Sequence, residues 1–325
     1  YGGLSWMAGG LYLDAHEGDS YHFLDILLRM ADGQVPHLDF VTPLGLLAFV
    51  PITALVQAGL SAGAATVLAQ MVVACALLPL VVYVGVSRLS RGVAVMFGLF
   101  TLGLTLALSY GSATSGVTIS MHYNRWAWSV AFVVLALAMI PPRVARPTLD
   151  GGLVGVLGGV RLLLKVTYFV TIMPVAAVAL ASRWGLRPIV AAIIGGLFVA
   201  IVVTIWQSPL FWLAYLHDLQ VVSGSVVRPF VGVPLNEIIA SPAYVGATIV
   251  GLATVFLIRK TEHAAVSTAI VLLLPGFIYI SYQNFGNDPQ WLLFIPVLLL
   301  ALRPESGVST VFGFDPVSYT HLRAH

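Results

Sequence analysis

Charged residues are scarce in this chain. Only 9% of its 325 residues are Asp, Glu, Lys or Arg, whereas hydrophobic residues make up 59%. A soluble domain carries about 25% charged residues, so this chain lacks the polar surface that folding in water requires. Apolar runs near the ~20 residues that cross a bilayer recur along it. The sequence therefore predicts an integral membrane protein and excludes a string of soluble domains.

Cysteine and the common catalytic signatures are also scarce or missing. The single cysteine, Cys75, lies inside an apolar run, so the chain cannot form an internal disulfide. No G-x-x-x-x-G-K-[ST], H-E-x-x-H, G-x-S-x-G or C-x-x-C motif occurs, which argues against an ATPase or a zinc protease. The net charge of +2 and the lack of a Lys/Arg cluster exclude nucleic acid as an expected partner.

The apolar runs predict a helix bundle. They cover residues 44–60, 62–87, 92–110, 126–141, 151–182, 189–206, 243–258, 264–282 and 291–302. The run 151–182 is too long for one span, so we expect two short helices that meet near 164–166. The run 44–60 contains Pro51 and is barely long enough, so we expect a helix at the membrane interface. The predicted fold is an all-α polytopic bundle of about 8–10 transmembrane segments.

The two ends of the chain depart from this pattern. The opening YGGLSWMAGGLYL is expected to be the tail of a hydrophobic segment whose start is missing. Residues 317–325, VSYTHLRAH, are expected to derive from adaptor or vector sequence. We therefore predict one transmembrane domain over 1–316, with an acidic extracytoplasmic loop at 1–43, an interfacial helix at 44–60 and a helix bundle at 61–304.

Basic residues gather on one side of this bundle. Loops rich in Lys and Arg favour the cytoplasm. If 44–60 does not cross and 151–182 crosses twice, nine of the fifteen basic residues share one side, namely Arg88, Arg91, Arg143, Arg146, Arg183, Arg187, Arg259, Lys260 and Arg303. Nine of the thirteen acidic residues then share the other side. We expect a bacterial inner-membrane protein whose acidic loop faces the exterior.

The acidic loop gathers groups that could carry chemistry. Residues 14–43 hold six of the thirteen acidic residues, and Gly18 separates Glu17 from Asp19. A tight turn at Gly18 would bring the two carboxylates near one point, where they can act as a general base or hold a divalent metal. The alternative is an ordinary solvated loop whose acids merely follow the topology.

An amphipathic helix is predicted next in this loop. Apolar side chains recur at helical spacing in YHFLDILLRMADG, and Gly33 is a plausible stop. We expect this juxtamembrane helix to lie on the membrane surface.

The order of these features resembles a known family. An acidic motif, a tyrosine, an amphipathic helix and then G-x-x-P-x-x-D-F-x-x-P is similar to the first extracytoplasmic loop of polytopic GT-C glycosyltransferases, the group containing protein O-mannosyltransferases and aminoarabinose transferases. The matching residues are Glu17, Tyr21, Gly33, Pro36, Asp39, Phe40 and Pro43.

The resemblance implies a catalytic role for this loop. In that family the loop supplies the carboxylate that accepts a proton from the acceptor nucleophile, and the donor is a polyprenyl-phosphate sugar. Many members have Asp-Glu where this chain has His16-Glu17, so the choice between Glu17 and Asp19 as base stays open. His16 and Tyr21 are expected in the substrate pocket. Asp39 is placed there too, although it is expected to fix the shape of the loop rather than do chemistry.

Two basic residues in the run 151–182 resemble the donor site of the same family, whose short helix pair has a Gly-rich first half and a central Lys. An uncompensated cation within the membrane costs roughly 2.5–3.5 kcal/mol, so Lys165 should face a cavity or a partner such as a lipid phosphate. Arg161, one helical turn earlier, shares this interpretation. The alternative is a side chain that extends to the interface.

The segment SMHYNRWAW supplies a third polar group. Arg125 is one of few basic residues on the predicted outer side, and its guanidinium suits a phosphate, with His122 and Asn124 completing a polar pocket. The alternative is an arginine that meets lipid headgroups. Trp126 and Trp128 are expected to be interfacial anchors.

Two functions from different classes remain open. The first is a membrane glycosyltransferase that passes a sugar from a polyprenyl-phosphate donor to a lipid, glycan or protein acceptor on the outer face. A divalent metal on Glu17 and Asp19 is the one candidate cofactor. The second is a secondary transporter or lipid flippase whose buried charges line a path. Candidate residues gathered at one face favour the enzyme.

Overall fold

The fold is described from a computed structural model of the chain. The structure describes residues 3, 7, 12–13, 17–108, 116–117, 119, 121–224, 234–261, 263–284 and 289–303. Within these ranges the chain forms thirteen α-helices and two 3-10 turns, and its one sheet is a parallel pairing of β1 (Tyr12–Leu13) with β2 (Gly116–Val117). The predicted helical class is confirmed.

The helical elements follow one another with short connections. They are α2 (Glu17–Ala31), η1 (Leu46–Ala48), α3 (Val50–Gln57), α4 (Ala62–Arg88), α5 (Arg91–Leu106), α6 (His122–Met139), α7 (Pro147–Leu164), α8 (Val166–Trp184), α9 (Arg187–Gln207), α10 (Leu210–Ser223), α11 (Leu235–Ala240), α12 (Pro242–Arg259), α13 (Ala264–Tyr282), η2 (Gln290–Leu293) and α14 (Phe294–Ala301).

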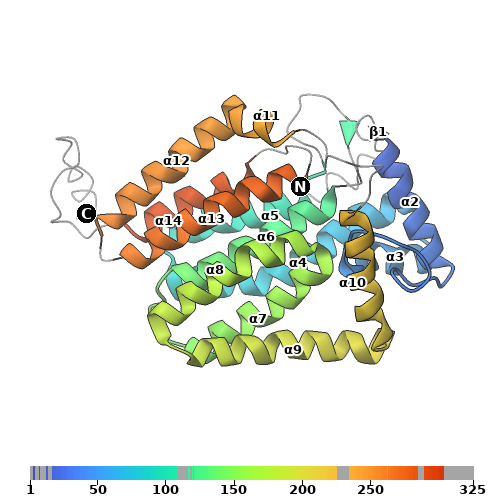
Figure 1. Cartoon of the computed structure of the whole chain (residues 1–325), viewed down its shortest axis with the longest axis horizontal. Helices are drawn as coiled ribbons and strands as arrows, with labels where there is room; N and C mark the ends of the chain where they lie inside the picture. Colours follow the sequence, from blue (N-terminus) through green and yellow to red (C-terminus); the bar gives the residue numbers. More distant parts are fainter. Residues whose placement is uncertain are drawn as a thin grey trace.

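Six of these helices are long and apolar enough to cross a membrane. They are α4, α7, α8, α9, α12 and α13. Figure 1 shows most of the long helices running side by side, while α10 crosses one end of the bundle near α2 and α3. The shorter apolar helix α5 and the stretch Gln290–Ala301 add to the bundle. The chain is therefore an integral membrane protein.

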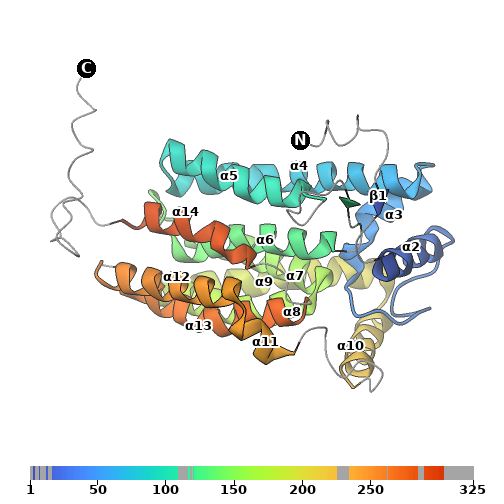
Figure 2. The same ribbon diagram turned by 90° about the horizontal axis from the view of Figure 1, so that it is seen from above.

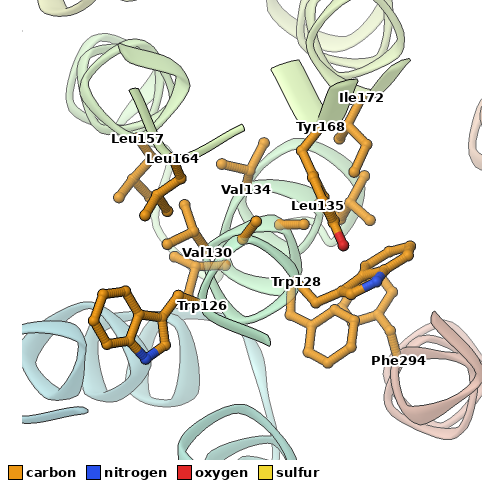
Figure 3. Packing of buried hydrophobic residues seen from close by; sticks show 14 of the residues in the cluster. Trp126, Trp128, Val130, Val134, Leu135, Leu157, Leu164, Tyr168, Ile172 and Phe294 are labelled. Carbon is orange, nitrogen blue, oxygen red and sulfur yellow. The ribbon is translucent and has the colours of Figure 1, made fainter. Parts of the chain in front are cut away.

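Helix α6 forms the centre of the bundle. It lies between α4 and α5 on one side and α7 and α8 on the other (Figure 2), and every residue from Asn124 to its end is buried. Trp126 and Trp128 point into the core from this helix (Figure 3). The indole N–H of Trp126 donates to Gln70 Oε1 at 2.5 Å, and the Trp128 ring meets the Tyr168 ring edge-on. The expectation that these tryptophans anchor at the interface is wrong, because α6 is enclosed by other helices.

Glycines join α7 closely to α9. A Cβ added to Gly155 would overlap the Ala192 carbonyl oxygen, and one added to Gly195 would overlap the Gly152 carbonyl. Small residues spaced four apart let two membrane helices approach backbone to backbone. The Gly-rich half of the run 151–182 is therefore a helix-packing surface.

One end of the bundle carries three arginines, Arg88, Arg143 and Arg183, beside a single carboxylate, Asp150; we call this the arginine end. The Arg88 guanidinium donates to Asp150, and Tyr83 donates to the same carboxylate at 2.8 Å. As the charge pattern of the loops predicts, residues far apart in sequence share this end.

Helix α2 packs on protein rather than lying on a membrane surface. Its apolar residues Phe23, Ile26, Leu27 and Met30 are buried, and the Phe23 ring lies 6.0 Å from the Phe49 ring and 4.8 Å from the His122 ring. The amphipathic pattern is present as expected, but α3 and the start of α6 cover its apolar face.

Candidate functional site

The helix pair breaks at one residue. Helix α7 ends at Leu164 and α8 begins at Val166, with Lys165 between them in an extended conformation (φ −160°, ψ 116°). Its Nζ donates to Asn284 Oδ1, lies 3.5 Å from Asn124 Oδ1 and 3.4 Å from the Gln283 carbonyl, and stands 5.4 Å from the centre of the Tyr123 ring. We call this group the lysine site. The predicted break and the predicted meeting of Lys165 with Asn124 are both present.

The end of α7 is closed by segments distant in sequence. A helix end leaves backbone carbonyls without partners inside the helix, and within a membrane these groups must be satisfied by protein. The Tyr215 hydroxyl of α10 donates to the Leu162 carbonyl at 2.7 Å, and the Gly45 N–H donates to the Leu164 carbonyl at 3.2 Å. A Cβ at Gly45 would overlap Leu163. The first loop and α10 thus meet at the break.

Arg161 braces the same break from inside. Its side chain is fully buried, and Nη2 donates to the Tyr168 carbonyl in the first turn of α8. Its Nε and Nη1 have no hydrogen-bond partner among the residues that the structure describes. A buried guanidinium with unused donors favours an anionic partner.

The first turn of α6 contributes residues unequally. Asn124 holds Lys165 and also donates to Met121 Sδ at 3.2 Å. Arg125 follows it in the chain and is 2% exposed. His122 Nδ1 lies 2.9 Å from the Ile119 carbonyl and Nε2 lies 2.7 Å from the Ala48 carbonyl. Both His122 nitrogens thus face backbone carbonyls, so this ring ties α6 to η1 instead of completing a pocket beside Lys165.

The acidic pair lies on a helix and not in a turn. Glu17, Gly18 and Asp19 form the first turn of α2, so the tight turn expected at Gly18 is absent. Residues two apart on a helix do not face each other, which separates the two carboxylates. Glu17 is exposed, Asp19 is half-buried and Tyr21 is 70% exposed. No printed contact joins these three residues to Lys165.

Two further expectations concern metal binding and the first residues of the acidic motif. Asp14 and His16 lie outside the described residues. Among the residues that the structure describes, no group of three or more His, Cys, Asp or Glu side chains is placed to hold a metal ion.

Asp39 shapes the first loop. Its carboxylate accepts the Val35 N–H at 2.6 Å, while its own N–H donates to the Val35 carbonyl at 2.9 Å. Gly33 has a positive φ of 91°, which favours glycine because a Cβ is poorly tolerated there. These contacts agree with the shaping role expected of Asp39.

A buried pair that the sequence reasoning missed holds this loop to α10. His37 Nδ1 lies 2.8 Å from Asp218 Oδ2, which also accepts the Thr42 N–H at 3.0 Å. The His37 ring packs against Phe211 and Tyr215. Burial lowers the pKa of His37, and the bond to Asp218 only partly offsets this. The available signal was Asp218 itself, an acid within the apolar stretch FWLAYLHDLQ.

Comparisons place no known protein beside this one. Neither protein-family models, nor curated proteins, nor solved structures match the chain. The function is therefore inferred from the site.

Proposed function

We propose that the chain is a GT-C-like membrane glycosyltransferase. It takes a sugar from a polyprenyl-phosphate donor and passes it to a lipid, glycan or protein acceptor. The observation that carries the proposal is the lysine site: Lys165 lies at a helix break near one end of the bundle, where α6, α7, α8 and the first loop meet.

The lysine site suits a lipid phosphate. Asn124 and Asn284 hold the ammonium group in place before substrate arrives, and a preorganised cation stabilises charge that grows on a leaving group. Arg161 offers unused donors at the same break, and Arg125 adds a buried positive charge next to Asn124. In the proposed complex these groups contact the donor phosphate.

The proposed reaction needs one base. Glu17 or Asp19 accepts the proton of the acceptor hydroxyl while its oxygen forms a bond to the anomeric carbon of the sugar. The bond from that carbon to the phosphate oxygen breaks, and the polyprenyl phosphate leaves with the extra negative charge. Phe23 of α2 touches His122, two residues before Asn124, so α2 packs at the same end of the bundle as the lysine site.

The membrane arrangement forms part of the proposal. With α5, α6 and the stretch Gln290–Ala301 added to the six long helices, the count falls within about 8–10 spans. The lysine site and the acidic loop face the exterior of a bacterial inner membrane, and the arginine end faces the cytoplasm.

The test is sugar transfer in membranes that carry the protein. Labelled sugar is followed from a panel of polyprenyl-phosphate donors. We expect Lys165→Ala to lower transfer by about a hundredfold, and Glu17→Gln or Asp19→Asn to abolish it, whichever residue is the base.

The matched control is Lys260→Ala, which removes a lysine that lies over the Phe256 ring in α12. It should leave transfer unchanged. Wild-type protein that inserts but transfers from no donor contradicts the enzyme and favours the transporter or flippase. Transfer that survives both carboxylate substitutions moves the base out of the first loop.

A further inference from the structure

The arginine end has more positive than negative charge. Arg88 and Asp150 form a buried ion pair, with side chains 0% and 1% exposed. Arg183 of α8 is half-buried and donates through Nη2 to the Met139 carbonyl at 2.7 Å. Arg143 donates through Nη1 and Nη2 to the Val86 and Leu89 carbonyls at 2.8 and 2.6 Å. Three guanidinium groups thus stand beside one carboxylate.

These contacts bring the three arginines into one group. The Arg143 N–H donates to the Ser87 carbonyl at 2.8 Å, while Arg88 Nη1 donates to the Ser87 hydroxyl at 2.5 Å. Met139, which holds Arg183, is the last residue of α6 and lies just before the link that carries Arg143. The group therefore joins the ends of α4, α6 and α8.

The partners present do not neutralise this group. Backbone carbonyls at helix ends accept arginine N–H groups and suit positive charge, but they carry no net charge. Arg88 Nε and Arg183 Nη1 are buried and have no hydrogen-bond partner among the described residues. Buried charge without compensation is unfavourable, so a further anion is expected.

We propose that Arg183, with Arg88 and Arg143, binds the phosphate of an anionic phospholipid headgroup at the arginine end. A phosphodiester offers acceptor oxygens and one negative charge, and guanidinium groups bind phosphate through paired hydrogen bonds. The arginines lie at the ends of membrane-spanning helices, the depth at which headgroups lie, and basic pockets between such helices bind anionic lipids. The occupant is a lipid because the flanking spans α4 and α8 are apolar along their length.

This site is separate from the lysine site, and its occupancy does not depend on sugar transfer. The arginine end is reached from the last turns of α4 and α8, whereas Lys165 lies at the opposite end of α8. A failed transfer assay therefore leaves this proposal standing, and the reverse also holds.

The test is lipid retention. The protein is moved into detergent, exchanged into nanodiscs of phosphatidylcholine with or without phosphatidylglycerol, and weighed by native mass spectrometry. We expect the wild type to keep phosphatidylglycerol through extensive washing. Arg183→Gln should weaken retention by about tenfold, the effect of losing one charge-assisted bond pair.

The matched control is Arg187→Gln, which removes the same charge from an exposed arginine at the start of α9. It should retain the lipid. Equal retention in all three proteins overturns the proposal, and so does an equal loss in both variants, because that result needs only general attraction. Inorganic phosphate that displaces the lipid at millimolar concentration overturns the lipid as the occupant.

A second variant guards against misfolding. Arg88→Gln alone leaves Asp150 buried without its partner, whereas Arg88→Gln with Asp150→Asn removes both charges together. The double variant should fold and still bind phosphatidylglycerol more weakly than the wild type. Unchanged binding in this variant limits the site to Arg183 and Arg143 and contradicts the proposed part of Arg88.

Discussion

At the scale of single residues, the most informative contact is between His37 and Asp218. The two lie 181 positions apart, and both side chains are nearly inaccessible to solvent. His37 also has a positive φ of 73°, an uncommon conformation for a residue other than glycine. Such a residue is held in place only if its surroundings determine its conformation. The pair therefore fixes the first loop against α10 and, through Tyr215, against the end of α7.

The pair predicts a pH-dependent stability. Because burial lowers the native pKa of His37 below its ordinary value of 6.5, the unfolded chain binds this proton more readily than the native protein. Stability should be full above pH 6.5 and fall as the pH drops from 6.5 toward the lower native pKa. Thermal unfolding in detergent at pH 7.5 and 5.5 measures the loss.

The control for this prediction is on the same helix. His37→Asn should reduce the difference between the two pH values, while His217→Asn, which changes an exposed histidine of α10, should not. A wild-type midpoint that rises at pH 5.5 would mean that the Asp218 carboxylate outweighs burial.

At the scale of elements, the Gly-rich half of the helix pair has a structural explanation. Gly151, Gly155 and Gly159 of α7 face Pro188, Ala192 and Val199 of α9. The register increases along both helices together, so the two run parallel with α8 returning between them. The resemblance to a glycosyltransferase helix pair drew attention to these glycines, but the backbone contact itself accounts for their place.

This contact predicts a strong effect of a single methyl group. Gly155→Ala should destabilise the protein by about 1–3 kcal/mol, since overpacking forces the helices apart. Gly103→Ala in α5 meets no atom within 4 Å, so it should be neutral or stabilise by up to about 1 kcal/mol through helix propensity. Unfolding midpoints of both variants in one detergent compare them. Equal midpoints would show that α7 and α9 do not pack through their backbones.

At the scale of the whole molecule, charge and contacts agree on two ends. Arg88, Arg143 and Arg183 meet at one end, while Lys165, Asn124 and the first loop meet at the other. The positive residues of short loops favour the cytoplasm, which orients the bundle.

The orientation is tested by labelling single cysteines from outside intact cells. In a Cys75→Ser background, an impermeant maleimide should label Ser61→Cys, an exposed residue at the start of α4, and should not label Arg91→Cys at the start of α5. Labelling of Arg91→Cys alone would reverse the orientation without changing the fold, and would place the lysine site on the cytoplasmic side.

Local pattern was enough to predict the helical class, the membrane location, the break at Lys165 and the amphipathic face of α2. Each of these depends on properties that neighbouring residues carry along the chain: hydropathy, helical spacing and an intramembrane charge that must find a partner.

The tertiary structure decided what those features touch. It buried Trp126 and Trp128 because other helices enclose α6, drew Gly18 into a helix, turned His122 toward backbone carbonyls and paired His37 with Asp218. Contacts between distant segments depend on how whole helices pack, and hydropathy is the same for a side chain that faces lipid as for one that faces a neighbouring helix.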